Sequence, residues 1–475
     1  MSNLTDLLPA GAGGKQVDFV ASGTIGNGVT VALKSDGTVE AVSGVTAGAG
    51  TPVVFEAAST RYTSATFDSN LNKVVVAYQD VSNSSYGTAI VGTVSGTSIS
   101  FGTPVVFESA ESNWCSVVFD TNSNKVVIAY NDNASFPVGT AIVGTVSGTA
   151  ISFGSAKVFD ANDCYQFSSV FDSSANKVVI AYNTGYNRGR AVVGTVSGTS
   201  ISFGSTTIYN SARTENIAAT FDSSNNKVVI AYRDNFSSSE AVVGTVSGTS
   251  ISFGTPVVIG SIDTIWASTF DSNAGKVVLA FYDPLNSYYG SAIVGTVSGT
   301  SISFGTPVVF NSEGTFRYST TFNSSANKVV ISYRGGSSTN GSIISGAVSG
   351  TSIAFGTSVV FETGSVDSLS STYDSTNDKV VTTYEDLGNS DYGTASVFQS
   401  ASSNNTSFIG ISDAAISDTA SGSVTIKGGI SANVTGLTPN STYYVQSDGS
   451  LSTTASDVLA GKALSSTSIN LDYTT

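Results

Sequence analysis

Short apolar runs bounded by turn residues fill most of the chain, and the most regular is Lys-Val-Val-Ile-Ala-Tyr at residues 125–130. Such runs are typical of β-strands. Close copies end at seven tyrosines spaced 52, 52, 50, 50, 51 and 51 residues apart: Tyr78, Tyr130, Tyr182, Tyr232, Tyr282, Tyr333 and Tyr384. A second segment, Gly-Thr-Val-Ser-Gly-Thr-Ser-Ile-Ser-Phe-Gly at 92–102, returns from 144, 194, 244 and 295. A period near 50 residues made of strands and turns predicts a β-propeller with one blade per repeat.

Each repeat divides into four expected strands. In the copy at 112–159 these are Ser-Val-Val-Phe-Asp, Lys-Val-Val-Ile-Ala-Tyr, Thr-Ala-Ile-Val-Gly-Thr-Val, and Ile-Ser-Phe-Gly with the residues after it. Residues 41–55 align without gaps on 93–107, whereas the repeat that begins near residue 370 lacks its last strand. We therefore predict an all-β, seven-bladed propeller of four-stranded blades, in which residues 46–56 close the ring and remove an open sheet edge.

The two ends of the chain do not follow the repeat. Residues 28–42 alternate around Ser-Asp-Gly and predict a β-hairpin, and the segment after residue 400 contains short strands separated by turn residues. We predict an N-terminal arm and hairpin at 1–45, a propeller at 46–400, and a small β-sandwich or barrel-like domain at 401–475. Because both ends of a closed ring emerge together, the hairpin is expected to pack with the C-terminal domain.

Composition excludes several classes of function. The net charge of −15 argues against nucleic-acid binding, and the absence of histidine removes the Ser-His-Asp type of catalytic site. No cofactor or metal site is predicted. No apolar run approaches ~18 residues, so no membrane insertion is expected, and the first residues lack the features of a secretory signal. For Cys115 and Cys164 we expect free, mostly buried thiols, with a disulfide left open.

The predicted propeller has two unlike faces. The turn between the first two strands is nearly the same in every repeat, as in FDSNLNK and FDTNSNK, and its aspartate is expected to cap the turn rather than bind calcium. The loops of the opposite face vary, and they contain all seven arginines and both tryptophans. Variable loops on a rigid scaffold are where recognition usually occurs.

Arginine and exposed aromatic residues are the types that bind sugars, carboxylates and proteins. The candidate ligand-binding residues of the variable face are Arg61, Tyr62, Trp114, Tyr165, Tyr186, Arg213, Trp266, Tyr288, Arg317 and Tyr318. A structural alternative exists for each of them, since aromatic rings can close the central channel and arginines can pair with acids of the same loops.

Two terminal stretches carry a family resemblance. Gly-Lys-Gln-Val-Asp-Phe-Val through Lys-Ser-Asp-Gly-Thr-Val at 14–39, and Phe-Ile-Gly-Ile-Ser through Ala-Gly-Lys-Ala-Leu-Ser-Ser-Thr at 408–467, resemble the ends of structural proteins from tailed phages of marine bacteria. In such proteins the ends commonly flank a variable insert. The resemblance implies a virion component, such as a tail fibre, an appendage or a capsid-surface protein, and assigns no residue roles.

Three functions follow as hypotheses. The first is a non-enzymatic tail fibre or surface appendage that contacts other virion proteins through its terminal β domain and binds a host-surface glycan or protein through the variable face. The second is structural decoration or cementing of a capsid or tail. The third is a depolymerase of surface polysaccharide, for which no carboxylate pair stands out. Assembly into homo-oligomers is left open, because no heptad run provides a coiled coil.

Overall fold

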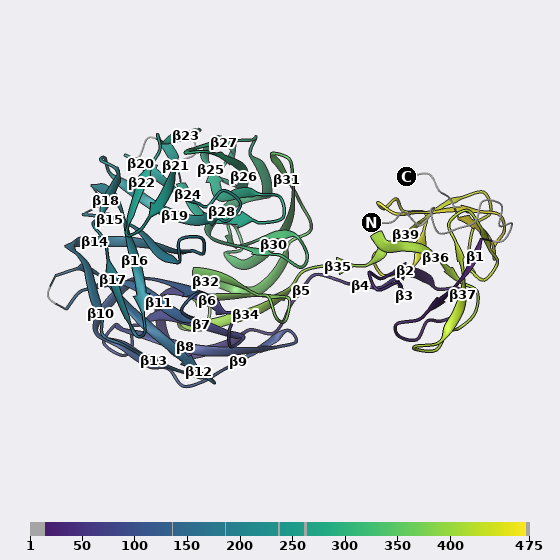
Figure 1. Ribbon diagram of the computed structural model, residues 1–475, viewed down its shortest axis with the longest axis horizontal. Helices are drawn as coiled ribbons and strands as arrows, with labels where there is room; N and C mark the ends of the chain where they lie inside the picture. The colour runs from purple at the N-terminus through teal and green to yellow at the C-terminus, as the bar shows by residue number, and fades with distance from the viewer. Residues whose placement is uncertain (1–14, 135, 186, 236–237, 261–263, 472–475) are drawn as a thin grey trace. The chain divides into compact units, whose positions relative to one another are not determined.

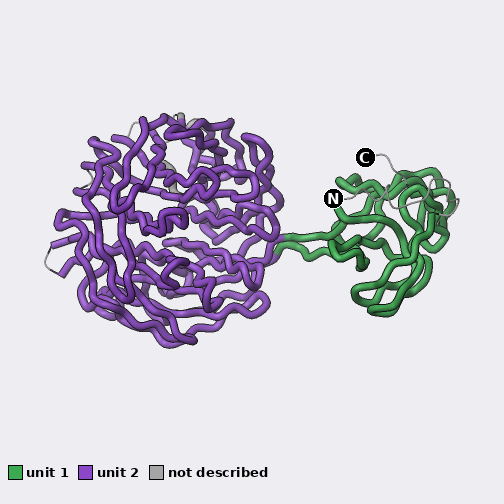
Figure 2. The backbone as a smooth tube through the Cα atoms, viewed as in Figure 1, with its two compact units in different colours: residues 1–47, 401–475 green, residues 48–400 purple. Residues whose placement is uncertain are grey.

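The computed structural model describes residues 15–134, 136–185, 187–235, 238–260 and 264–471. The chain forms two compact units, one made of residues 48–400 and the other of both chain ends, 1–47 and 401–475 (Figure 2). The expected boundary at 45/46 thus lies at 47/48 in the structure. The secondary structure is β-strand, apart from the three-residue 3₁₀ helices η2 (Pro284–Asn286) and η3 (Asn405–Ser407) among the described residues. No described helix is long and apolar enough to cross a membrane.

In the larger unit, the strands of each sequence repeat pair antiparallel with one another. In the second repeat, the latter part of β10 (Val105–Asp120) pairs with β11 (Lys125–Asp132), and β11 pairs with β12 (Val138–Ser147). The outer edge of β12 pairs with β13 (Ala150–Phe153) and then with the start of β14 (Lys157–Asp172). The expected last strand of one repeat therefore continues directly into the first strand of the next. Figure 1 shows consecutive repeats following one another around this unit.

The other repeats follow the same order. The remaining inner strands are β6 (Val53–Asp68), β19 (Thr214–Asp222), β24 (Thr264–Asp271), β28 (Val308–Asn323) and β32 (Val359–Asp374). The second strands are β7 (Lys73–Asp80), β15 (Lys177–Thr184), β20 (Lys227–Asp234), β25 (Lys276–Asp283), β29 (Lys328–Gly335) and β33 (Lys379–Asp386). The third are β8 (Tyr86–Ser95), β16 (Arg188–Ser197), β21 (Ser238–Ser247), β26 (Tyr289–Ser298), β30 (Asn340–Ser349) and β34 (Tyr392–Gln399). Short outer strands are β5 (Gly48–Ala49), β9 (Ser98–Phe101), β17 (Ser200–Phe203), β18 (Thr207–Asn210), β22 (Ser250–Phe253), β23 (Val257–Gly260), β27 (Ser301–Phe304) and β31 (Ser352–Phe355).

The beginning and end of the larger unit pair with each other. Strand β34 of the last repeat pairs with β5 and with the start of β6, so that Val53 lies opposite Ala395. Each inner strand contacts the next one, and β32 contacts β6. Residues 48–56 thereby provide the outer strand that the last repeat lacks in its own sequence.

A serine near the middle of the inner strands connects neighbouring repeats. The hydroxyl oxygen of Ser64 accepts a hydrogen bond from the backbone N–H of Val117 at 3.0 Å, and Ser116 accepts one from Ser169 at 2.9 Å. The same bond joins the last repeat to the first, because Ser370 accepts from the N–H of Ala65 at 2.9 Å. Hydrophobic clusters also span neighbouring sheets, as where Ala77 and Ile128 share one core.

A buried tyrosine in the second strand bonds to an acid in most repeats. The Tyr130 hydroxyl donates to Glu108 at 3.0 Å, and the equivalent pairs are Tyr78–Glu56, Tyr182–Asp160 and Tyr384–Glu362. In the fourth repeat, Tyr232 donates instead to Glu240 of the third strand, which lies opposite it. In the fifth repeat, Phe281 occupies the position of this tyrosine. It pairs with Ser291 of the third strand, just as Tyr130 pairs with Thr140. The assignment of Tyr282 to the repeated tyrosine series was therefore wrong by one residue. The fifth repeat has Gly260 at the position that Glu108 occupies in the second, so in the fifth repeat the hydroxyl and the acid are both absent.

The repeated turn aspartates cap their turns, as predicted. The Asp120 carboxylate accepts from the backbone N–H groups of Asn122 and Ser123, both at 2.9 Å. Cys115 and Cys164 are free and buried, which confirms that expectation.

The smaller unit contains two five-stranded sheets. In the first, β1 (Gln16–Val20), β37 (Ser421–Ile426), β36 (Phe408–Ser412), β2 (Thr30–Leu33) and β3 (Val39–Ala41) are adjacent in that order. In the second the order is β38 (Ile430–Ser431), β42 (Ile469–Leu471), β41 (Leu459–Ala463), β39 (Thr442–Val445) and β40 (Leu451–Ser452). Strands β4 (Gly44–Val45) and β35 (Ser402–Ser403) form a separate pair. Ala32 and Phe408 of the first sheet share a core with Tyr443 of the second, and the N-terminal hairpin pairs with the C-terminal segment through β2 and β36.

Candidate functional site

A bulge interrupts the inner strands near the variable face. In β6 the pairing register breaks between Arg61 and Ser64, and in β10 between Asn113 and Ser116. One residue at each of six such bulges has a positive φ: Tyr62 (52°), Trp114 (56°), Gln166 (53°), Asn216 (51°), Arg317 (50°) and Ser368 (50°). We call these six the bulge residues. A positive φ is uncommon outside glycine and is an outlier for bulky side chains, whereas a bulge is a means of redirecting a side chain. The bulges therefore present six different side chains at equivalent positions.

Buried amide side chains hold these bulges in place. The Asn131 side chain donates to the carbonyl of Cys164, next to the following bulge, at 2.5 Å. Asn183 does the same one repeat later, donating to the carbonyl of Thr214 at 2.9 Å. The oxygen of the Gln166 side chain accepts from the backbone N–H of Asn216 at 2.8 Å. A bulge residue is thus supported by its neighbouring repeats, which keeps the set rigid.

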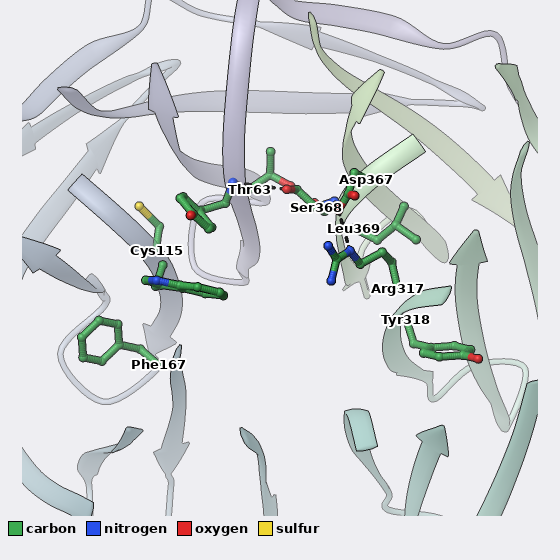
Figure 3. Close-up of a pocket in the computed structure, with 10 residues that line it drawn as sticks. Thr63, Cys115, Phe167, Arg317, Tyr318, Asp367, Ser368 and Leu369 are labelled. Carbon is green, nitrogen blue, oxygen red and sulfur yellow. Dashed lines mark hydrogen bonds and ion pairs between the residues drawn. The ribbon is translucent and has the colours of Figure 1, made fainter. Parts of the chain in front are cut away.

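Four of the bulge residues and the residues beside them line a cavity of about 380 Å³, which we call the mouth cavity. Its lining residues are Tyr62, Thr63, Trp114, Cys115, Phe167, Arg317, Tyr318, Asp367, Ser368 and Leu369 (Figure 3). The rings of Tyr62 and Trp114 lie 4.8 Å apart between centroids and form an aromatic wall. A neighbouring cavity of about 350 Å³ shares Trp114 and Arg317 and adds Gln166 and Asn216.

An ion pair lies across from the aromatic wall. The Nε of Arg317 donates to Asp367 at 2.7 Å, and Arg334 approaches the other oxygen of the same carboxylate at 3.6 Å. Figure 3 shows the Arg317 guanidinium beside Asp367, with the Tyr318 hydroxyl directed away from it. The mouth cavity therefore combines flat aromatic surface with charged donors and acceptors.

Glu385 is a buried carboxyl next to this ion pair. It lies opposite Asp367 in the pairing of β32 and β33, is 8% exposed, and accepts from the Ser368 hydroxyl at 3.3 Å. Burial raises the pKa of Glu385 to about 7, and the nearby Asp367 and Asp391 add to the effect while Arg61 opposes it. Glu385 is therefore a buried carboxyl behind the lining residues Asp367 and Ser368.

Below the mouth cavity, a cavity of about 230 Å³ is lined by residues of all seven inner strands, which places it at the centre of the unit. Its walls include the serines that connect neighbouring repeats. Cys115 lines both cavities, and burial raises the pKa of its thiol to about 12. A thiol with such a pKa is a poor nucleophile. Among the described residues, no group of three Asp, Glu or Cys is placed to hold a metal ion.

The structure brings together some of the predicted residues. Tyr62, Trp114 and Arg317 are bulge residues of the mouth cavity. Tyr318 also lines the cavity, but it is only 5% exposed and its hydroxyl donates to the carbonyl of Thr315 at 3.0 Å. The expectation that Tyr318 is an exposed aromatic is therefore wrong, because its ring is buried after the bulge at Arg317.

Other predicted residues lie elsewhere. Arg61 is exposed beside the bulge of β6, and Tyr165 is half-buried at the equivalent position in β14. Arg213 pairs with Glu215 at 2.6 Å, and Tyr288 is 53% exposed on a loop. Tyr186 and the side chain of Trp266 lie outside the described residues.

Sequence reasoning missed four polar or charged residues of the site: Gln166, Asn216, Asp367 and Ser368. The candidate ligand-binding residues were chosen by residue type, so arginines and aromatic residues were included and amides and serines were not. A positional signal existed, because every bulge residue stands eleven positions before the lysine that begins the next strand.

No model of a known protein family matches the chain. No curated protein matches it either. Solved structures do resemble it, and one is described as the crystal structure of BP39L lectin from Burkholderia pseudomallei. The two share 10% sequence identity with a TM-score of 0.56, over 74% of this chain and 98% of that chain. The larger unit therefore has an all-β, β-propeller-like fold. At this identity the likeness concerns the fold alone.

Proposed function

We propose that the larger unit is a seven-bladed propeller closed by residues 48–56, and that it binds carbohydrate at its mouth cavity without chemical conversion. The pairing of β34 with β5 and β6 supports the closure. A structural neighbour described as a lectin also supports sugar binding.

The Tyr62–Trp114 wall opposite Arg317 and Asp367 is the observation on which the binding proposal rests. A pyranose has an apolar C–H face, which packs against aromatic rings, and hydroxyl groups, which need donors and acceptors at its edge. The mouth cavity offers both within a volume in the usual range for small-molecule sites, roughly 300–1,000 Å³. Because the bulges fix these side chains before binding, little conformational entropy is lost on association.

Binding to a glycan array by the full chain tests this proposal. Trp114→Ala is expected to weaken binding by more than about tenfold, as for a central aromatic contact, while Trp114→Phe retains much of it. Circular dichroism of both variants controls for folding. Equal binding by wild type and Trp114→Ala would refute the assignment of the site.

A depolymerase is the second candidate, and one observation favours it. Asp367 is held by two arginines, whereas the pKa of the adjacent Glu385 is raised to about 7. Two neighbouring carboxyl groups, one of them with a raised pKa, are a feature of glycoside hydrolase sites. Release of reducing sugar from polysaccharide by wild type, and its loss in Asp367→Asn, would favour hydrolysis over simple binding.

We also propose that the protein is a virion component whose smaller unit attaches it to other virion proteins. The resemblance of residues 14–39 and 408–467 to marine phage proteins supports this, and both stretches contribute strands to the same unit. Counting copies per particle separates the two roles, since a fibre is present at tens of copies or fewer and a decoration protein at hundreds.

A further inference from the structure

A second group of aromatic side chains lies on the variable face beside the mouth cavity. The ring of Tyr282 packs against Tyr288 at 5.7 Å and against Phe316 at 6.3 Å between centroids. Tyr288 is 53% exposed and Phe316 is 46% exposed. We call these three residues the aromatic ledge. Large aromatic rings at such exposure are costly to leave in water and are common in binding surfaces.

The ledge continues directly into the mouth cavity. Phe316 precedes the bulge residue Arg317 in β28, and it lies opposite Arg334 of β29. Both arginines contact Asp367, which lines the mouth cavity. Phe316 and the cavity residue Arg317 are consecutive in β28, so the ledge adjoins the cavity wall at this point.

The backbone at Tyr288 is held in a position that several repeats share. Its N–H donates to the carbonyl of Asp283 at 2.8 Å, and its carbonyl accepts from the N–H of Thr315 at 3.2 Å. Tyr288 has a φ of 61°, and the equivalent residues Ser85 and Asp391 have φ values of 61° and 60°. Their carbonyls likewise accept from Ser112 and Thr60. The same backbone conformation thus occurs with serine, tyrosine or aspartate. The fold therefore does not require an aromatic residue at position 288.

From this arrangement we infer that the ligand is an oligosaccharide of several linked sugars, with one unit in the mouth cavity and the next units on the aromatic ledge. The inference rests on the proposed carbohydrate binding and adds the size of the ligand to it. Linked pyranoses present repeated C–H faces, so an oligosaccharide can pack against two separate aromatic surfaces, which a single sugar cannot do. Arg317 follows Phe316 directly and lines the mouth cavity, so its guanidinium can donate to hydroxyl groups of the linkage region.

Substitutions taken from the chain's own repeats test the ledge without disturbing the fold. Tyr288→Ser installs the residue of Ser85, and Phe316→Asn installs the residue of Asn113, which precedes the bulge residue in β10. The probes are malto-, cello-, manno- and chito-oligosaccharides of one to five units, measured by calorimetry with the full chain. Trp114→Ala serves as the reference variant for the mouth cavity.

Three outcomes decide the inference. Support consists of wild-type affinity that rises from one to three units, together with a double variant, Tyr288→Ser with Phe316→Asn, that binds the longer probes roughly tenfold more weakly and single sugars unchanged. The inference is overturned, and the proposed function stands, when Trp114→Ala loses binding but affinity neither rises with length nor falls in the double variant. Absence of binding in all four series, or binding that Trp114→Ala leaves intact, overturns both.

Discussion

The tyrosine–acid pairs of the second strands give a sharp test of how the repeats are stabilised. Tyr130 is fully buried, and its hydroxyl donates to the half-buried Glu108 at 3.0 Å. A hydrogen bond to a charged group contributes about 1.5–3 kcal/mol to stability. Because solvent can rehydrate Glu108 once the hydroxyl is gone, Tyr130→Phe is expected to cost about 1.5 kcal/mol, the lower end of that range.

The inverse change in the fifth repeat is the matched control. Phe281→Tyr places a hydroxyl at a fully buried position where the chain has Gly260 instead of an acid. An unpaired buried hydroxyl costs about 1–3 kcal/mol, so this substitution also destabilises although it is the chemical reverse of the first. Tyr130→Phe and Phe281→Tyr are therefore both expected to lower the free energy of unfolding, although one is the chemical reverse of the other.

Urea unfolding followed by far-ultraviolet circular dichroism measures both changes. Glu108→Gln and the double variant with Tyr130→Phe complete a cycle that isolates the pair. A Tyr130→Phe variant within about 0.5 kcal/mol of wild type, the usual range of neutral surface changes, would refute the stated role of the bond. Stabilisation by Phe281→Tyr would refute the argument from the absent acid.

Two further predictions concern the serine connections and the mouth cavity. Ser116→Ala removes an acceptor for the backbone N–H of Ser169 and is expected to lower stability by about 1–2 kcal/mol in the same urea assay, with Ser116→Thr retaining part of the bond. The raised pKa of Glu385 means that the folded state keeps a proton which the unfolded state releases, so the contribution of this group to stability is greatest below about pH 4.5 and is lost as pH rises to about 7. Glu385→Gln should abolish this component, and thermal unfolding between pH 4 and 8 measures it; identical pH profiles for both proteins would contradict the assignment.

Much of the strand order could be predicted from the sequence because the repeat is regular. Lysine and aspartate at the invariant turn mark the strand ends, and the aspartates cap the turns as their position indicates. The error at Tyr282 came from matching a residue type instead of its distance from Lys276, which selects Phe281.

The bulges could not be predicted from the backbone conformations that their residues usually adopt. Tyrosine, tryptophan and arginine rarely adopt positive φ, so nothing in Tyr62, Trp114 or Arg317 themselves indicates that conformation. Hydrogen bonds between neighbouring repeats accompany this conformation, as where the Tyr62 N–H donates to the Ser368 hydroxyl at 3.3 Å. The same bulge alters which side chains face the core, and for this reason Tyr318 is buried although it follows a cavity residue.

Fluorescence of Trp114 during ligand titration tests the central claim most directly. The chain has two tryptophans, so a Trp266→Phe background leaves Trp114 as the single reporter. Titration with the oligosaccharide series is expected to give a saturable spectral change at one ligand per chain, with the same affinity that calorimetry measures. Calorimetric binding with an unchanged Trp114 spectrum would place the ligand elsewhere and contradict the mouth cavity as the binding site.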